Sequence, residues 1–197
     1  NPNVCRYAGN LCPNHSRFGK YLISYCSQVP VPQKGQGEIS EGHIVKAISL
    51  NSEEAKYFNN LSSAQSLCGK YIEAEASLRE AIRLNPDFAI AHINLGNMLL
   101  EQDRADETRG VLESAAERLP ENLEICSLLA KLYADLNQYD LTIDMLRASL
   151  ARNPGIAELH LNLAQALYHV KKFDDAKQVC ATAIKLNPKL STAHNIL

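Results

Sequence analysis

The 197-residue chain contains no tryptophan, and aromatic residues make up 6% of it. It has no run of about 18 or more apolar residues, the length that a membrane-spanning helix needs. Its 20 lysines and arginines against 22 acids give a net charge of −2, which provides no general attraction to nucleic acid or to an anionic membrane. H-E-x-x-H, G-x-S-x-G and P-loop motifs are absent. The sequence therefore carries no signature of an enzyme, a nucleic-acid-binding protein or a membrane-spanning protein.

A 34-residue period is the strongest feature that is present. Four prolines keep this spacing: Pro86, Pro120, Pro154 and Pro188. Four leucines keep it as well: Leu61, Leu95, Leu129 and Leu163. Sequence periods of about 20–50 residues indicate supersecondary units that stack on one another, each burying its apolar face against its neighbours.

Each period is predicted to form two antiparallel helices. In one period, residues 89–102 carry apolar residues at helical spacing, and a second helix follows a short turn and ends before Pro120. Small residues at one position should let the paired helices approach closely: Ser62, Gly96, Ala130 and Ala164. The predicted array comprises a half-repeat at 38–54, full repeats at 55–88, 89–122, 123–156 and 157–190, and a truncated helix at 191–197.

These residues match the pattern of the tetratricopeptide repeat. One repeat supplies Cys126, Leu129, Ala130, Tyr133, Thr142, Leu146, Ser149 and Pro154, and the next keeps the same residue classes. The chain thus resembles the tetratricopeptide repeat family over about residues 38–197. The resemblance implies an all-α fold, a right-handed α-solenoid of antiparallel helix pairs, preceded by an irregular N-terminal segment. Gln65, Thr108 and Thr142 depart from the family pattern.

The resemblance also implies a concave groove built by the first helix of each pair. Its candidate peptide-binding residues are Asn60, Asn94, Asn97, Lys131, Asn162, Gln165 and Tyr168. Asn60, Asn94 and Asn162 share one repeat position, and an amide there can pair with both the N–H and the C=O of an extended peptide. The alternative is that asparagine merely suits an exposed helical position, and Leu128 interrupts the row. Ile93 stands where the family's clamp for acidic chaperone tails has a lysine, so no such clamp is expected.

Residues 1–37 differ from the rest of the chain in composition. They contain four basic residues and no acid, and glycines and prolines interrupt any helical pattern. Three cysteines and a histidine stand together there: Cys5, Cys12, His15 and Cys26. Such a set could hold a structural zinc ion, but the spacing is not diagnostic, and one disulfide or no bond at all are the alternatives. No other cofactor is expected.

The remaining cysteines favour a packing role. Cys126 and Cys180 occupy apolar positions of the repeat pattern, so we interpret them as small core residues. Unpaired buried thiols suit a reducing compartment, and we expect a cytoplasmic location. His92, His160 and His194 are separated by one or more whole repeats, too far to share a metal ion, and are interpreted as packing residues.

The sequence predicts a non-catalytic scaffold that binds an extended or helical protein segment in its groove. An alternative is that the array is the substrate-recruiting arm of a larger enzyme, of the glycosyltransferase, sulfotransferase or oxygenase type. A third is an assembly subunit that self-associates through the ends of the solenoid. Because the chain starts without methionine and stops part-way into a predicted helix, we expect that it is part of a longer protein. No catalytic residue is predicted, and neither nucleic acid nor membrane insertion is expected.

Overall fold

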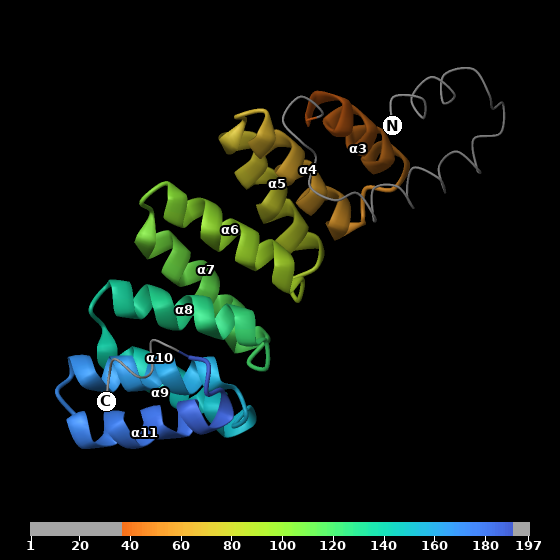
Figure 1. Ribbon diagram of the computed structural model, residues 1–197. Helices are drawn as coiled ribbons and strands as arrows, with labels where there is room; N and C mark the ends of the chain where they lie inside the picture. Colours follow the sequence, from red (N-terminus) through yellow and green to blue (C-terminus); the bar gives the residue numbers. More distant parts are fainter. Residues whose placement is uncertain (1–36, 191–197) are drawn as a thin grey trace. The chain divides into compact units, whose positions relative to one another are not determined.

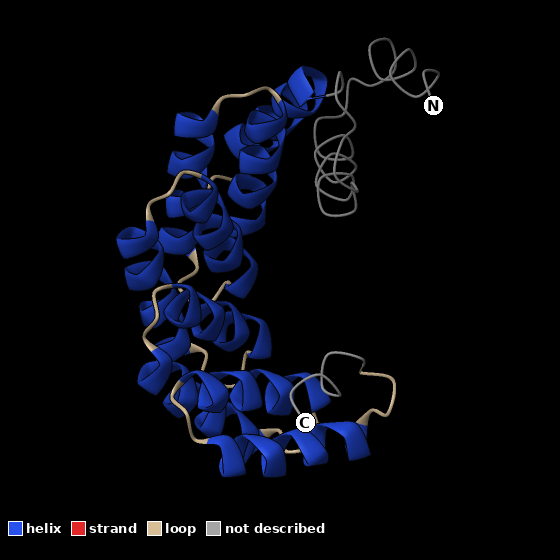
Figure 2. Cartoon of the chain, turned by 60° about the vertical axis from the view of Figure 1, so that its left-hand side comes forward, coloured by secondary structure: helices blue, strands red, loops and turns tan. Residues whose placement is uncertain are grey.

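The computed structural model describes residues 37–190 of the chain. All regular elements in this range are α-helices, and no strand occurs in it (Figure 2). The chain divides into two compact units, residues 1–91 and 92–197, each of which is described by itself. The candidate zinc ligands and the predicted helix at 191–197 lie outside the described residues.

The first unit contains three described helices, α3 (Gly37–Leu50), α4 (Ala55–Leu67) and α5 (Tyr71–Leu84) (Figure 1). Helix α4 packs against both of the others. Apolar residues on α3 and α4 recur at three- and four-residue spacing, which places them on one face of each helix. Together they form a buried cluster of Ile44, Ala47, Tyr57, Leu61 and Ala64. The core of this unit is therefore set by helical periodicity.

The second unit contains most of α6 and all the described helices after it. Helix α6 begins at the join, and its residues from His92 onward belong to this unit. The bounds are Ala89–Glu101 (α6), Ala105–Arg118 (α7), Leu123–Asp135 (α8), Tyr139–Arg152 (α9), Ala157–His169 (α10) and Phe173–Leu186 (α11). Helices α8 and α9 pack together, as do α10 and α11, and their short turns make the partners antiparallel. The predicted all-α fold of antiparallel helix pairs is confirmed, while the division of the chain into domains stays a prediction.

Proline ends the second helix of each pair by acting on the residue before it. Helix α5 stops at Leu84, and Asn85, which precedes Pro86, has φ −137° and ψ 92°. A proline ring clashes with a helical conformation of the preceding residue and shifts that residue to the extended region. The residues before the other three prolines are extended in φ as well, at −125°, −132° and −140°: Leu119, Asn153 and Asn187. The prediction that these prolines mark helix ends is confirmed.

The turn inside each pair contains one residue with a left-handed backbone. These residues are 34 positions apart: Gly69 (φ 76°), Asp103 (57°), Asn137 (58°) and Lys171 (62°). The amide after each one donates to a carbonyl five residues earlier, as Lys172 N does to Leu167 O at 2.9 Å. This is the bond that closes a helix in the Schellman arrangement. Glycine adopts the left-handed conformation without strain, whereas Lys171 adopts it at a cost in free energy.

Small residues allow partner helices to approach closely, as the sequence predicts. A Cβ atom added at Gly96 would lie 3.1 Å from Leu112 Cδ2, on the facing helix α7. The other residues at this repeat position are nine-tenths or more buried: Ser62, Ala130 and Ala164. At Gly96, even a methyl group would require the Leu112 side chain to shift by a few tenths of an ångström.

Polar residues that depart from the family pattern find hydrogen-bond partners inside the core. Gln65 and Ser77 are 8% and 7% exposed, and Ser77 Oγ donates to Gln65 Oε1 at 2.7 Å. The buried hydroxyl of Thr108 donates to the carbonyl of Arg104 at 3.0 Å. Because a buried polar group is costly only when it is unpaired, these departures are compatible with the repeat fold.

Candidate functional site

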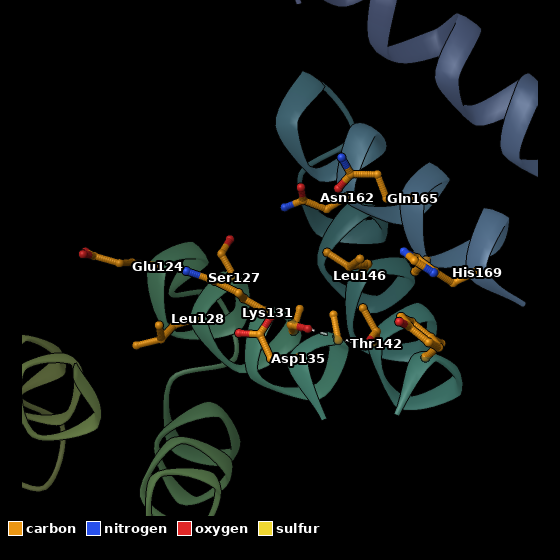
Figure 3. Close-up of a pocket in the computed structure, with 14 residues that line it drawn as sticks. Glu124, Ser127, Leu128, Lys131, Asp135, Thr142, Leu146, Asn162, Gln165 and His169 are labelled. Atoms are coloured by element: carbon orange, nitrogen blue, oxygen red, sulfur yellow. Dashed lines mark hydrogen bonds between the residues drawn. The ribbon is translucent and has the colours of Figure 1, made fainter. Parts of the chain in front are cut away.

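A groove of about 810 Å³ opens within the second unit between α8 and α10. Figure 3 shows the side chains of these two helices on opposite walls, with residues of α9 between them. Polar residues contributed by the walls include Glu124, Ser127, Lys131 and Asp135 from α8, and Asn162, Gln165 and His169 from α10. The groove is therefore built by the first helices of two successive pairs, as the family resemblance implies.

Helical periodicity explains which residues reach the groove. Glu124, Ser127, Lys131 and Asp135 follow one another at intervals of three or four residues, and so occupy one stripe of α8. The buried face of the same helix is carried by other residues, among them Leu129, which is 1% exposed. Each wall therefore uses one side of its helix for packing and the other for the groove.

The floor of the groove is lined largely by small or apolar side chains. Ala130, Thr142, Leu146 and Ala166 all line it and are buried. Thr142 Oγ1 donates to Gln138 O at 3.1 Å and also approaches Ala130 O at 3.4 Å, the dashed contact in Figure 3. This hydroxyl joins α9 to α8 and is fully engaged in the fold. The short side chains of the floor leave room for the backbone of a ligand.

Aromatic side chains close one end of the groove. The Tyr139 and His169 rings, both in the lining, stack with centroids 4.5 Å apart and an interplanar angle of 5°. Tyr168 lies edge-on to His169 at 6.4 Å and to Phe173 at 5.3 Å. Tyr139 Oη donates to Asn137 Oδ1 at 3.0 Å, which ties the ring to the turn before α9. This end of the groove therefore carries a cluster of aromatic rings that contact one another.

Charged and amide side chains of the walls are open to solvent. Glu124, Lys131, Asp135, Asn162 and Gln165 are all exposed. None of their side chains forms a hydrogen bond or an ion pair with another residue of the described range 37–190. An exposed amide offers one acceptor and two donors, and the lysine offers three donors. The groove thus presents polar groups that the fold itself does not use.

The reverse side of α8 is firmly attached to the preceding helix. Tyr133 is buried, and its hydroxyl donates to Glu113 Oε1 on α7 at 2.7 Å. Burial, together with this hydrogen bond, raises the pKa of Tyr133 to about 12. The neutral hydroxyl is therefore the form that the fold requires. The α8 wall is held in place from behind while its open face remains solvated.

The structure brings together three of the seven residues predicted for the peptide groove. Lys131, Asn162 and Gln165 line the same groove. Tyr168 is exposed beside it and contacts the ring of His169. The other three lie elsewhere: Asn94 and Asn97 on α6, and Asn60 on α4 of the first unit. A continuous row of asparagines stays a prediction.

Three groove residues could not be found from the first-helix pattern. Tyr139, Thr142 and Leu146 come from α9, the second helix of its pair, and so fall outside a search restricted to first helices. Tyr139 stands one repeat before Phe173, and the shared aromatic character of that position was an available signal. Its stacking partner His169 is the last residue of α10.

His92, Cys126 and Cys180 act as packing residues, as the sequence predicts. His92, Cys126 and Cys180 are buried, and both cysteines are free thiols. Burial raises the pKa of the Cys180 thiol. His160 Nε2 lies 2.9 Å from Pro154 O, within the same repeat. No cluster of three potential metal ligands occurs between residues 37 and 190, and the candidate zinc ligands are outside that range.

Comparison with known proteins gives matches to repeat proteins. A family model described as a tetratricopeptide repeat matches residues 137–197, and one described as a TPR repeat matches residues 67–103. Human interferon-induced protein with tetratricopeptide repeats 2 is 31% identical over 100 residues, or 49% of this chain and 21% of that protein. Phagocyte signaling-impaired protein of Drosophila pseudoobscura pseudoobscura is 25% identical over 108 residues, or 55% and 11%. The chain spans only a small part of the length of these curated relatives.

Solved structures share the fold. YrrB, a TPR protein with an unusual peptide-binding site, has a TM-score of 0.67 at 18% identity, covering 91% of this chain and 88% of its own. MamA from Desulfovibrio magneticus RS-1 has a TM-score of 0.67 at 16% identity, covering 88% and 97%. Among the described helices, none has the length and apolar character that would let it cross a bilayer. The helix pairs, the two family models and the shared fold lead to one conclusion: the chain belongs to the tetratricopeptide repeat family.

Proposed function

We propose that the chain is a non-catalytic interaction module that binds a peptide segment of a partner protein in the groove between α8 and α10. The observation that carries this proposal is the set of exposed wall groups, Lys131, Asn162 and Gln165, that no described residue engages. Groups of this kind are available to a ligand without any internal bond being broken. YrrB, which has the same fold, is a peptide-binding protein, and this adds support.

The dimensions of the groove suit a short segment. Glu124 and Asp135 are the outermost lining residues of α8 and stand eleven positions apart. At about 1.5 Å per residue, that stretch of helix is about 16 Å long. An extended chain rises about 3.3 Å per residue, so about five extended residues would fill the groove. A helical ligand would present about three turns to the same length.

Chemistry of the walls favours recognition of a backbone. Asn162 and Gln165 lie on one stripe of α10, three residues apart, and each can donate to a carbonyl and accept from an amide. The small floor residues Ala130 and Ala166 let the backbone of a peptide approach the walls. If the array is joined to a catalytic domain in its parent protein, the same groove would hold the segment that is presented to that domain.

Selection from a random-peptide library displayed on phage tests the proposal, with the full chain as bait. Selected peptides are then titrated by fluorescence polarisation. Replacing Asn162 and Gln165 together with alanine should weaken binding about 10- to 30-fold, because about two hydrogen bonds are lost. The thermal midpoint should not change, since both side chains are exposed.

Two further variants make the result specific to the groove. Ser127→Trp places a bulky ring in the α8 wall and should abolish binding. Gln178→Ala removes an exposed amide of α11 that is not part of the groove, and should leave affinity unchanged. A library that yields no binder, or binders insensitive to Ser127→Trp, would refute the proposed site.

A further inference from the structure

Charges along the α8 wall alternate in sign. From the N-terminal end, the charged lining residues are Glu124, Lys131 and Asp135. Lys131 and Asp135 are four residues apart, a spacing that permits an ion pair on a helix, yet they form none. On the second helices of other pairs, by contrast, such neighbours do pair, as Arg83 does with Glu80 at 2.7 Å.

The facing wall adds no fixed charge of its own. The polar lining residues of α10 are Asn162, Gln165 and His169, and none of them is a carboxylate or a lysine. Between the walls, α9 contributes Tyr139, Thr142 and Leu146. A ligand in this groove therefore meets its strongest charges on α8 alone, in the order negative, positive, negative.

The spacing of these three charges along α8 predicts the spacing of the opposite charges in a bound peptide. Glu124 and Lys131 are seven residues apart, about 10 Å along the axis, and Lys131 and Asp135 are four residues apart, about 6 Å. In an extended chain these lengths correspond to about three and about two residues. A complementary segment therefore carries a basic residue, then an acidic residue three positions on, then a basic residue two positions beyond that.

We propose that the preferred partner of the groove is an extended segment with this basic–acidic–basic order, read in either chain direction. The proposal rests on the proposed function, because it names the ligand of that same groove. A wholly basic segment would bring a positive charge against Lys131. A wholly acidic one would be repelled by both Glu124 and Asp135. Opposed like charges are the means by which an interface rejects wrong partners.

Synthetic peptides of equal length test the pattern by fluorescence polarisation on the full chain. Matched peptides carry the pattern in either direction, an inverted peptide exchanges acids for bases, and a shuffled peptide keeps the matched composition with its charges adjacent. The better matched peptide should bind about tenfold more tightly than the inverted one, with the shuffled peptide between them. Raising the salt from about 50 mM to about 500 mM should remove most of this difference, because exposed charges are screened. Equal affinity for all the peptides at low salt would overturn the proposal.

A charge reversal on the protein sharpens the test. Lys131→Glu should transfer the preference to a peptide whose central acidic residue is replaced by a base. The matched control is Lys177→Glu, which changes the net charge equally at an exposed site of α11 outside the groove. That control should keep the original preference. If both variants behave alike, the pattern reflects net charge rather than the α8 wall, and the proposal is wrong.

Failure of this inference can be distinguished from failure of the proposed function. Library peptides that bind, are blocked by Ser127→Trp and show no charge order would refute the charge pattern alone. Absence of any peptide binding would refute both. A synthetic peptide of residues 1–36 that occupies the groove more tightly than the matched peptides would identify the chain's own N-terminal segment as the occupant, and would also overturn the pattern.

Discussion

Polar residues on α4 of the first unit and on α8 of the second serve opposite purposes. On α4, Ser63 Oγ donates to the backbone oxygen of Asn59 at 3.3 Å, and the buried Gln65 accepts a hydrogen bond from α5. On α8, Lys131 and Asp135 are exposed and bond to no described residue. Both helices are the first of their pairs, so the difference does not come from the fold. It arises because α4 uses its polar groups for its own packing and α8 leaves them for solvent or a ligand.

The same contrast is seen between residues that occupy one and the same repeat position. Ser63, Asn97 and Lys131 are separated by one repeat each. The serine is half-buried and bonded to its own helix, whereas the asparagine and the lysine are exposed. One repeat position can therefore be structural in one unit and available in another. A family pattern alone does not distinguish the two cases.

The largest effect is expected from the buried face of α8. Leu129 is 1% exposed and belongs to the core shared with α7, so Leu129→Ala should lower the free energy of unfolding by about 2–5 kcal/mol. Lys131→Ala, on the open face of the same helix, should change it by less than about 0.5 kcal/mol. Urea denaturation followed by circular dichroism measures both. Similar losses for the two variants would mean that α8 is not divided into a packed and an open face.

The next largest effect is expected from the loss of the hydrogen bond between α5 and α4. Ser77→Ala removes the donor to Gln65 Oε1 and leaves a buried amide oxygen unpaired, which should cost about 1–3 kcal/mol. Adding Gln65→Leu should restore much of the loss, because the orphaned group is then gone. In the second unit, Gln165→Ala should be close to neutral. A double variant no more stable than Ser77→Ala would show that the pair contributes through packing rather than through hydrogen bonding.

A pH-dependent effect is expected behind the α8 wall. The pKa of Tyr133 is raised from its ordinary value of 10 to about 12, so the folded state holds this proton more tightly than the unfolded state does. The corresponding stability is fully present below about pH 10 and is lost as the pH rises towards about 12, by about 1–2 kcal/mol. Urea denaturation across this window should show a smaller decline for Tyr133→Phe than for the unaltered chain. Parallel declines would contradict the assignment.

The smallest effects on stability are expected from substitutions in the turns, one in each unit. Lys171→Gly relieves a left-handed backbone and should raise the free energy of unfolding by about 0.5–1 kcal/mol, whereas Gly69→Ala should lower it by about 1 kcal/mol. Thermal or urea denaturation detects both shifts. A destabilised Lys171→Gly variant would indicate that the lysine side chain makes a contribution that outweighs its backbone strain.

Much of the fold follows from the sequence because its determinants are local or periodic. Pro86 and the prolines in register with it end helices through the residue before them, and the apolar spacing selects the buried faces. Two features were not predictable in this way. The partner of Gln65 stands twelve residues away on another helix. A lysine at position 171 gives no sign of a left-handed turn, whereas Gly69 does.

The groove could be predicted only in outline. Helical periodicity correctly places Lys131, Asn162 and Gln165 on the open faces of their helices. It does not indicate that Tyr139 would reach the groove from the second helix of a pair, because that depends on how α9 packs between its neighbours. Contacts between helices, rather than the pattern within one helix, decide which exposed residues share a site.

The Schellman turns are closed by a backbone amide, so the side chain of the donating residue takes no part in the closing bond. The donating residues are Lys70, Arg104, Gln138 and Lys172, so a neutral amide serves as well as a basic side chain. Mutation at these donor positions can therefore change the surface charge at the tip of each hairpin without loss of the backbone hydrogen bond that closes the turn.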